Sequence, residues 1–215
     1  MFFWIEATIL AFSLLGESDI NLKKIETNNF EKNSFRFYGG YESRPLMGFI
    51  LLGDIRQEYH HTSILGVDFS RKIKSDFKDL PLDLSLRMSV IRYDENNYQN
   101  NHNQYNFFLN AHYKTKYRGI PLRIFIGEGI SHAELVPYVE GRETRRLSGR
   151  DSKLMNYLNV GFDFRLSDLT GAHGLQNVRL GLANSHRSGA FKKIKMFNYT
   201  QGGSDFVSLF LEYDF

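Results

Sequence analysis

The amino-acid sequence predicts an all-β fold, an eight-stranded antiparallel β-barrel that crosses a bacterial outer membrane. Apolar and polar residues alternate with a period of two over several segments, as they do in strands with one apolar face. Several of these segments carry ten or more residues, which suits a tilted strand that crosses a hydrocarbon layer of about 30 Å. Strands of soluble proteins are usually shorter. The connections between the segments alternate in length, as in outer-membrane barrels.

Composition supports one domain with no cysteine chemistry. The chain has 215 residues, of which 15% are aromatic and 24% charged, so it is polar overall yet rich in strand formers. It contains no cysteine, which excludes disulfides, thiolate metal sites and a cysteine nucleophile. No apolar run is long enough for a transmembrane helix. The sequence therefore favours a single unit that crosses the membrane with strands.

We divide the chain into three parts. Residues 1–18, "MFFWIEATILAFSLLGES", are read as a signal peptide or the remnant of one, although no basic residue precedes the apolar run. The alternative is a short N-terminal strand or helix of the mature fold. Residues 19–32 form a polar lead-in segment, and residues 33–215 form the barrel domain.

The strands are expected where the alternation is clearest. Leu82, Leu84 and Leu86, for example, alternate with Asp83 and Ser85. The chain ends in an aromatic residue after such a row, which resembles the C-terminal assembly signal of outer-membrane barrels. The eight predicted strands cover residues 33–41, 61–72, 82–93, 104–116, 122–134, 154–166, 177–188 and 205–215.

The connections place the two ends of the barrel. Long outer loops and short inner turns are the rule for this class, so an even strand number puts the connection 189–204 outside the cell. In the first long loop, "LMGFILLGD" is apolar enough to extend a strand or to dip into the membrane.

Side chains fill the interior of a barrel of this size. We expect its inward charges to pair as a plug rather than to form a proton or ion path; they are Asp68, Asp83, Arg87, Asp163, Arg165, Arg179 and Glu212.

The segment "VRLGLANSHRSGAF" contains the candidate catalytic residues. Its lipid-facing row begins with apolar residues and continues with His186 and Ser188, while Arg187 between them faces the lumen. Asp205 falls in the outward row of the last strand at the same end. Serine, histidine and aspartate together form a hydrolase set, with Ser188 as nucleophile, His186 as general base and Asp205 orienting the imidazole. The alternative is that these polar residues only bind water and lipid headgroups.

The C-terminal part of the chain resembles the PagL-type lipid A 3-O-deacylases, small outer-membrane barrels with a Ser-His-Glu site. The resemblance rests on His186-Arg187-Ser188 at the end of the penultimate strand, on the last strand "GSDFVSLFLEYDF", and on "PLRIFIGEGIS" as the fifth strand. It implies the same roles for Ser188, His186 and Asp205. Two positions depart from the family: Asp205 replaces the usual Glu, and Gly189 replaces an Asn assigned to the oxyanion hole. Backbone N–H groups of Gly189 or Ala190 are then the expected oxyanion donors.

Basic outer loops suit the phosphates of lipid A, the expected partner within lipopolysaccharide. We expect substrate contacts from Arg142, Arg145, Arg146, Lys192 and Lys193, the alternative being solvated loops without a ligand. The histidines show no metal spacing, and we expect no metal, no cofactor and no nucleic-acid partner. A homodimer is left open.

Two functions follow. The first is an esterase that removes the 3-O-linked acyl chain of lipid A by a Ser-His-Asp mechanism. The second is a non-enzymatic outer-membrane barrel of the structural or adhesion type. A soluble lipocalin-like binder is a third, weaker reading.

Overall fold

The computed structural model describes residues 32–45 and 47–215. The predicted signal segment, residues 1–18, and nearly all of the lead-in segment lie outside the described residues. Within the described part, none of the helices has the length and apolar character that a membrane crossing requires.

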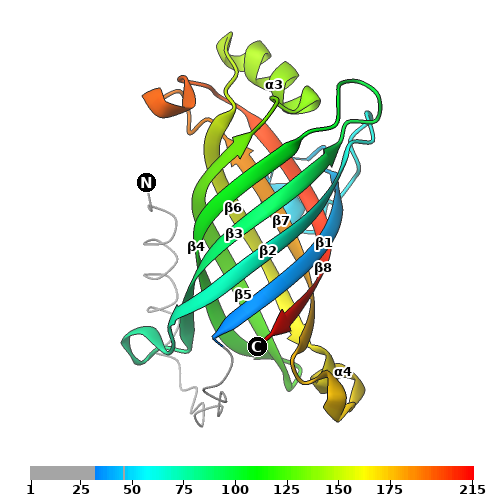
Figure 1. The fold of residues 1–215 in the computed structure, drawn as a ribbon, viewed down its shortest axis with the longest axis vertical. Coiled ribbons are helices and arrows are strands. Elements are labelled where there is room, and N and C mark those ends of the chain that lie inside the picture. The colour runs from blue at the N-terminus through cyan, green and yellow to red at the C-terminus, as the bar shows by residue number, and fades with distance from the viewer. Residues whose placement is uncertain (1–31, 46) are drawn as a thin grey trace.

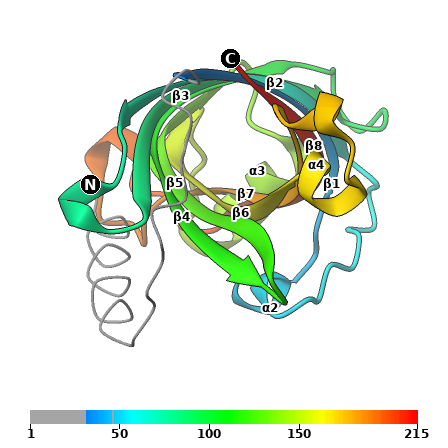
Figure 2. The same ribbon diagram turned by 90° about the horizontal axis from the view of Figure 1, so that it is seen from below.

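Eight antiparallel strands form a closed barrel in which each strand pairs with its sequence neighbours and β1 pairs with β8 (Figures 1 and 2). Each predicted strand overlaps one observed strand, and the end points differ by two residues at most. The prediction of the fold is therefore confirmed. The strands are β1 (Asn33–Glu42), β2 (Ser63–Lys74), β3 (Leu82–Asp94), β4 (Asn103–Tyr117), β5 (Ile120–Ala133), β6 (Leu154–Arg165), β7 (Val178–Ser188) and β8 (Gly203–Asp214).

The two ends of the barrel differ as predicted. The long connections gather at the end that carries α3, whereas the short turns, α4 and the C-terminus lie at the opposite end (Figure 1). Because long loops are extracellular in this class, the α3 end faces the outside of the cell. The connections also contain short helices, on which the sequence analysis made no prediction: α2 (Met47–Leu51), η1 (Phe77–Asp79), α3 (Tyr138–Ser148), α4 (Leu166–Thr170), η2 (His173–Leu175) and η3 (Lys195–Phe197).

The barrel exposes apolar side chains on its outer surface and buries polar ones in its lumen, the reverse of the distribution in a soluble protein. Outward apolar side chains such as Phe37, Met88 and Leu209 are about half exposed in the isolated chain, whereas inward polar ones such as Arg87 and Glu212 are buried. This is the arrangement that a lipid-facing wall and a filled lumen require.

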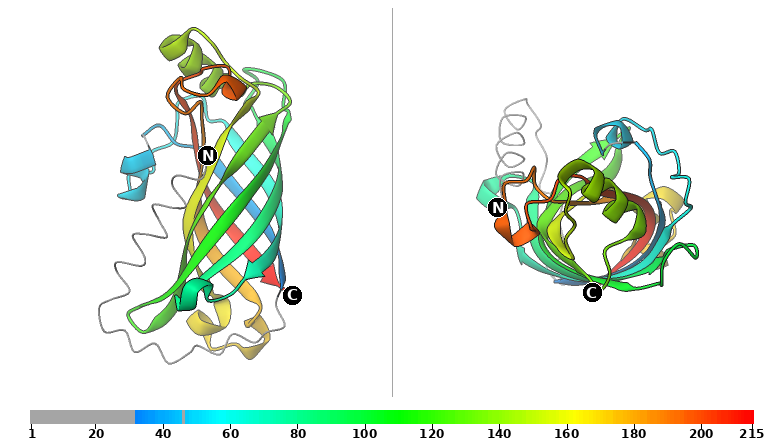
Figure 3. Two further views of the ribbon diagram at one scale, coloured as in Figure 1. Left: turned by 90° about the vertical axis from the view of Figure 1, so that its left-hand side faces the viewer. Right: turned by 90° about the horizontal axis from the view of Figure 1, so that it is seen from above.

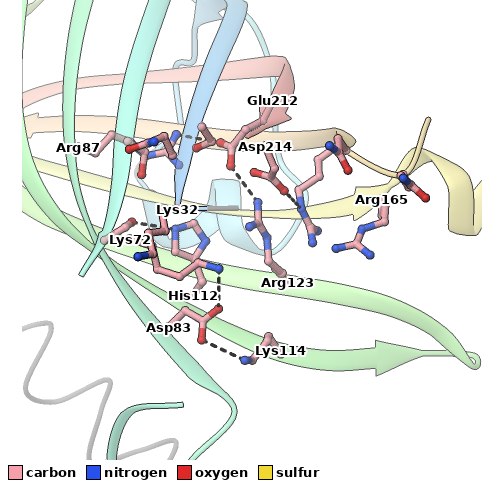
Figure 4. A pocket seen from close by; sticks show the side chains of 17 residues that line it. Lys32, Lys72, Asp83, Arg87, His112, Lys114, Arg123, Arg165, Glu212 and Asp214 are labelled. Carbon is pink, nitrogen blue, oxygen red and sulfur yellow. Dashed lines mark hydrogen bonds and ion pairs between the residues drawn. The ribbon is translucent and has the colours of Figure 1, made fainter. Parts of the chain in front are cut away.

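Ion pairs fill the lumen. Glu212 accepts from Arg36 Nε at 2.7 Å, from Arg87 at 2.9 Å and from Arg123 at 3.0 Å. Asp163 pairs with both Arg123 and Arg179. The predicted plug of paired charges is thus present. Arg165, also predicted to face inward, is an exception, because its buried Nε has no hydrogen-bond partner among the described residues. It lines a cavity of about 120 Å³ at the periplasmic end (Figure 4).

Two aromatic residues that interrupt the apolar and polar alternation of β8 also belong to the lumen. The Phe210 ring lies 3.7 Å from the guanidinium carbon of Arg36, and Phe206 packs edge-on against Tyr93. A guanidinium whose charge is shared by a carboxylate can stack on an aromatic face. The aromatic residues therefore support the ion pairs instead of breaking the strand.

Candidate functional site

The candidate site lies on the outer face of β7 and β8, near their extracellular ends. Leu182 is 41% exposed and faces outward, and strand alternation carries Asn184, His186 and Ser188 along the same face. Between them, Ser185 points inward, where its hydroxyl contacts the Tyr157 hydroxyl at 3.0 Å. The row therefore changes from apolar to polar where the wall approaches the extracellular side.

A hydrogen-bonded histidine–carboxylate pair is at the centre of this face. His186 and Asp205 are direct partners in the antiparallel register, and His186 Nδ1 lies 3.1 Å from Asp205 Oδ1. The Asn184 side-chain amide donates to the same oxygen at 2.8 Å. When ionised Asp205 accepts the Nδ1 proton, the imidazole keeps Nε2 as its proton acceptor. The pair is thus arranged as a general base with an orienting acid.

Ser188 shares the face but not the hydrogen bond. Among the described residues, its hydroxyl is bonded neither to His186 nor to another side chain. Residues two apart along a strand are separated by about 6.6 Å of rise, so side-chain rotation has to bring the hydroxyl to Nε2. Loose contacts of this kind in ligand-free sites commonly tighten when substrate binds.

The backbone around Ser188 is tightly packed. Gly203 pairs with Ser188 across β7 and β8, and a Cβ atom there would lie 1.7 Å from the Arg187 carbonyl oxygen. The next residue, Gly189, donates its N–H to the Gly202 carbonyl at 3.2 Å. That N–H is already engaged, which disfavours Gly189 as an oxyanion donor. Ala190 has a left-handed backbone, with φ of 52°, and its N–H remains the better candidate.

A charged cleft of about 720 Å³ begins at Asp205. Its floor is the start of β8, one wall is the connection between β1 and β2, and the other wall is α3. Three of the predicted substrate-binding residues, Arg142, Arg145 and Arg146, line it. Lys192 and Lys193 are exposed in the connection between β7 and β8 and do not line it.

Acidic groups in the cleft limit its positive charge. Arg145 is paired with Asp151, whereas Arg142 lies 2.8 Å from His60 Nε2 and has no carboxylate partner among the described residues. Burial raises the pKa of Glu143, which lines the cleft. Glu42, Glu58 and Asp205 line the cleft as well, so its four arginines, Arg44, Arg142, Arg145 and Arg146, face four carboxyls, and Arg142 is the arginine best placed to meet an anion.

Buried contacts fix α3 over the mouth of the barrel. Glu140 is fully buried, 3.0 Å from Arg187 Nε, and accepts from the Ser204 hydroxyl at 2.8 Å. Burial raises the pKa of Glu140, and the guanidinium of Arg187 opposes that shift. Arg187 faces the lumen, as predicted from its position between His186 and Ser188. Its structural contacts hold the wall of the cleft in place.

The sequence analysis missed three residues of this region. Asn184 was recognised only as part of the outward row, although its position two residues before His186 already indicated a shared face. Arg44 and Glu143 carried no sequence signal, because only the folded loops bring them to β8. Within the described residues, no cluster of three or more histidine or acidic side chains is placed to hold a metal ion.

Comparison with known proteins supports the fold class. No protein-family model and no curated protein sequence matches the chain. Among solved structures, the outer membrane enzyme PagL superposes with a TM-score of 0.54 at 14% identity, covering 84% of this chain and 98% of that one. The N-terminal β-barrel domain of Pseudomonas aeruginosa OprF gives 0.47 at 12% identity, covering 86% and 98%. Neisserial surface protein A (NspA) gives 0.42 at 12% identity, covering 85% and 96%.

The closed eight-stranded barrel, its outward apolar wall and the superposition on PagL define the fold class. The chain has the fold of the small outer-membrane β-barrels.

Proposed function

We propose that the protein is an outer-membrane esterase that hydrolyses the 3-O-linked acyl chain of lipid A. The observation that carries the proposal is the His186–Asp205 hydrogen bond on the lipid-facing side of the wall, with Ser188 on the same face. The pair lies on the outward face where the row changes from apolar to polar, so the exposed apolar surface of the wall begins beside it. A histidine held by a carboxylate, with a serine on the same face, is the set of groups that a serine esterase uses.

The proposed reaction has two steps. Ser188 Oγ attacks the ester carbonyl while His186 Nε2 takes its proton, and the tetrahedral intermediate collapses as that proton passes to the departing sugar hydroxyl. Water, deprotonated by His186, then attacks the acyl-enzyme; the ester bond to Ser188 Oγ breaks, His186 returns the proton to that oxygen, and the fatty acid and free Ser188 are released. Asp205 holds the ring and stabilises the imidazolium, and the Ala190 N–H is the proposed oxyanion donor.

The surroundings supply a place for each part of this substrate. The acyl chain would lie along the outward rows of β7 and β8, where Leu182 and Leu209 are exposed. The phosphorylated sugar would lie in the cleft lined by Arg142 and Arg146, since guanidinium groups bind phosphate through paired hydrogen bonds. Lys192 and Lys193 remain candidates for outer phosphate contacts. PagL, the enzyme among the structural neighbours, has the same barrel architecture.

The second candidate is a barrel without enzymatic activity. The observation in its favour is that Asp205 is already satisfied by Asn184 and His186, so the three side chains also make sense as a closed interface cluster.

Mass spectrometry of lipid A distinguishes the two candidates. The protein is expressed in a bacterium whose lipid A carries a 3-O-linked hydroxyacyl chain, and the lipid A mass should fall by that one chain. Ser188→Ala should restore the original mass. Ser185→Ala is the matched control, because it makes the same change on the same strand toward the lumen. If wild type and Ser188→Ala give the same lipid A, the esterase proposal is wrong.

A further inference from the structure

The short helix α2 is an apolar element outside the barrel wall. Its segment places Phe49, Leu51 and Leu52 on the surface, exposed by 56%, 54% and 85%, while Ile50 is buried. So much apolar surface in one stretch of six residues is unusual for a loop in water. Such a patch marks an interaction site.

The path of the chain places α2 beside the candidate site. The connection leaves β1 where the Ser43 N–H donates to the Asp205 carbonyl, and α2 then contacts β7. In the barrel order β8 separates β1 from β7, so this connection has to cross the outer face of β8. Figure 3 shows α2, in blue, beside the wall and below the level of α3. The crossing accounts for the burial of Asp205 and Asn184 on an outward face.

The apolar surface of α2 continues the lipid-facing belt of the barrel. Leu182 on β7 and Leu209 on β8 are exposed on the same side of the wall. Charged residues bracket the apolar stretch: Arg44 precedes it, and Asp54 and Arg56 follow it as an ion pair. An apolar segment flanked by charges is typical of elements that lie in a membrane interface.

We propose that α2 inserts into the acyl chains of the outer leaflet, where Phe49, Leu51 and Leu52 contact lipid. The segment thereby anchors the connection between β1 and β2 over the outer face of β7 and β8. This interaction does not depend on the esterase proposal, because it concerns the resting barrel in its membrane. It implies that lipid reaches the His186–Asp205 pair beside α2 rather than across it.

The absence of cysteine makes the test direct, since one introduced cysteine gives one labelling site. Phe49→Cys and Leu52→Cys carry a nitroxide in the full chain, reconstituted in vesicles that contain lipopolysaccharide. Leu209→Cys is the lipid-facing control and Asn100→Cys, in the connection between β3 and β4, is the water control. We expect both α2 labels to be accessible to oxygen and shielded from a soluble nickel complex, as at Leu209→Cys.

Two outcomes would overturn the proposal. Labels at α2 that behave like Asn100→Cys would place the helix in water. Spin–spin broadening that disappears on dilution with unlabelled protein would assign the patch to contact with a second copy. The same measurement in a Ser188→Ala background should be unchanged, so loss of catalysis and loss of insertion are separate results.

Discussion

Polar side chains occupy both faces of β7 and β8, and the two faces differ in what surrounds those groups. On the inner face, Arg187 has Gln104, Glu140 and the Lys153 carbonyl as partners. On the outer face, the chain of contacts from Asn184 through Asp205 ends at His186 Nε2, which has no hydrogen-bond partner among the described residues. A network buried in the lumen can only stabilise the barrel, whereas one that ends at the outer face can act on a substrate.

Asp205→Asn, on the outer face, is the substitution for which we expect the largest effect, a loss of hydrolytic rate. An amide no longer supports the imidazolium or the correct tautomer, and in serine hydrolases this change costs on the order of 10³- to 10⁴-fold in rate. We expect that loss in acyl release from purified lipid A, with little change in the urea midpoint. The matched control is Asp214→Asn on the lumenal face of β8, which removes the 2.9 Å contact to Arg179 Nε and should lower stability while sparing hydrolysis. Normal hydrolysis by Asp205→Asn would make the outer network structural.

Glu212→Gln tests the lumenal half of the comparison. The substitution leaves Arg36, Arg87 and Arg123 without the carboxylate that they share, and breaking a buried ion pair typically costs about 3–5 kcal/mol. Urea unfolding in detergent should show a loss of that order, whereas lipid A hydrolysis by the folded fraction should be retained.

If Glu212→Gln does not fold, Arg179→Gln gives a milder test, because it removes a guanidinium from Asp163 and Asp214, of which Asp163 keeps Arg123. A loss below about 1 kcal/mol in both variants would mean that the lumenal pairs do not carry the barrel's stability.

Gly203→Ala tests the close approach of the β7 and β8 backbones beside Ser188. The added methyl group would lie 1.7 Å from the Arg187 carbonyl oxygen, so β8 has to move away from β7 beside Ser188. Overpacking of this kind typically costs about 1–3 kcal/mol, and we expect a fall in kcat as well as in the urea midpoint. The control is Gly39→Ala, since its nearest contact would be an ordinary 3.6 Å to Leu65. Equal effects of the two substitutions would show that the close approach at Gly203 has no special role.

The sequence predicted the barrel well because alternation and strand length are local properties. It predicted that His186, Ser188 and Asp205 share a face for the same reason, since parity along β7 and β8 decides it. The cleft could not be predicted, because Arg44 and Arg142 reach it from loops whose paths depend on tertiary contacts. The hydrogen bond of the Gly189 N–H could not be predicted either, because its acceptor, the Gly202 carbonyl, lies in the folded connection to β8.

The smallest expected effect concerns a carboxyl at the extracellular mouth. Burial raises the pKa of Glu95 to about 7, and Glu95 accepts from the Tyr138 N–H at the start of α3 at 3.2 Å. Its pKa in the unfolded chain is about 4.3, so its stabilising effect is present at low pH and declines as pH rises from that value through about 7. Hydrogen exchange at the Tyr138 amide, corrected for intrinsic base catalysis, should therefore accelerate over this range, by at most about tenfold per pH unit.

Glu95→Gln should remove this pH dependence while the amide remains protected, because a neutral amide oxygen can still accept from Tyr138. Burial lowers the pKa of the neighbouring His102, which disfavours the charged imidazole beside Glu95. Identical exchange profiles in wild type and Glu95→Gln would assign any pH dependence to other groups. A difference would show that ionisation at the extracellular mouth loosens α3, the wall of the charged cleft, without altering the network on the outer face of β7 and β8.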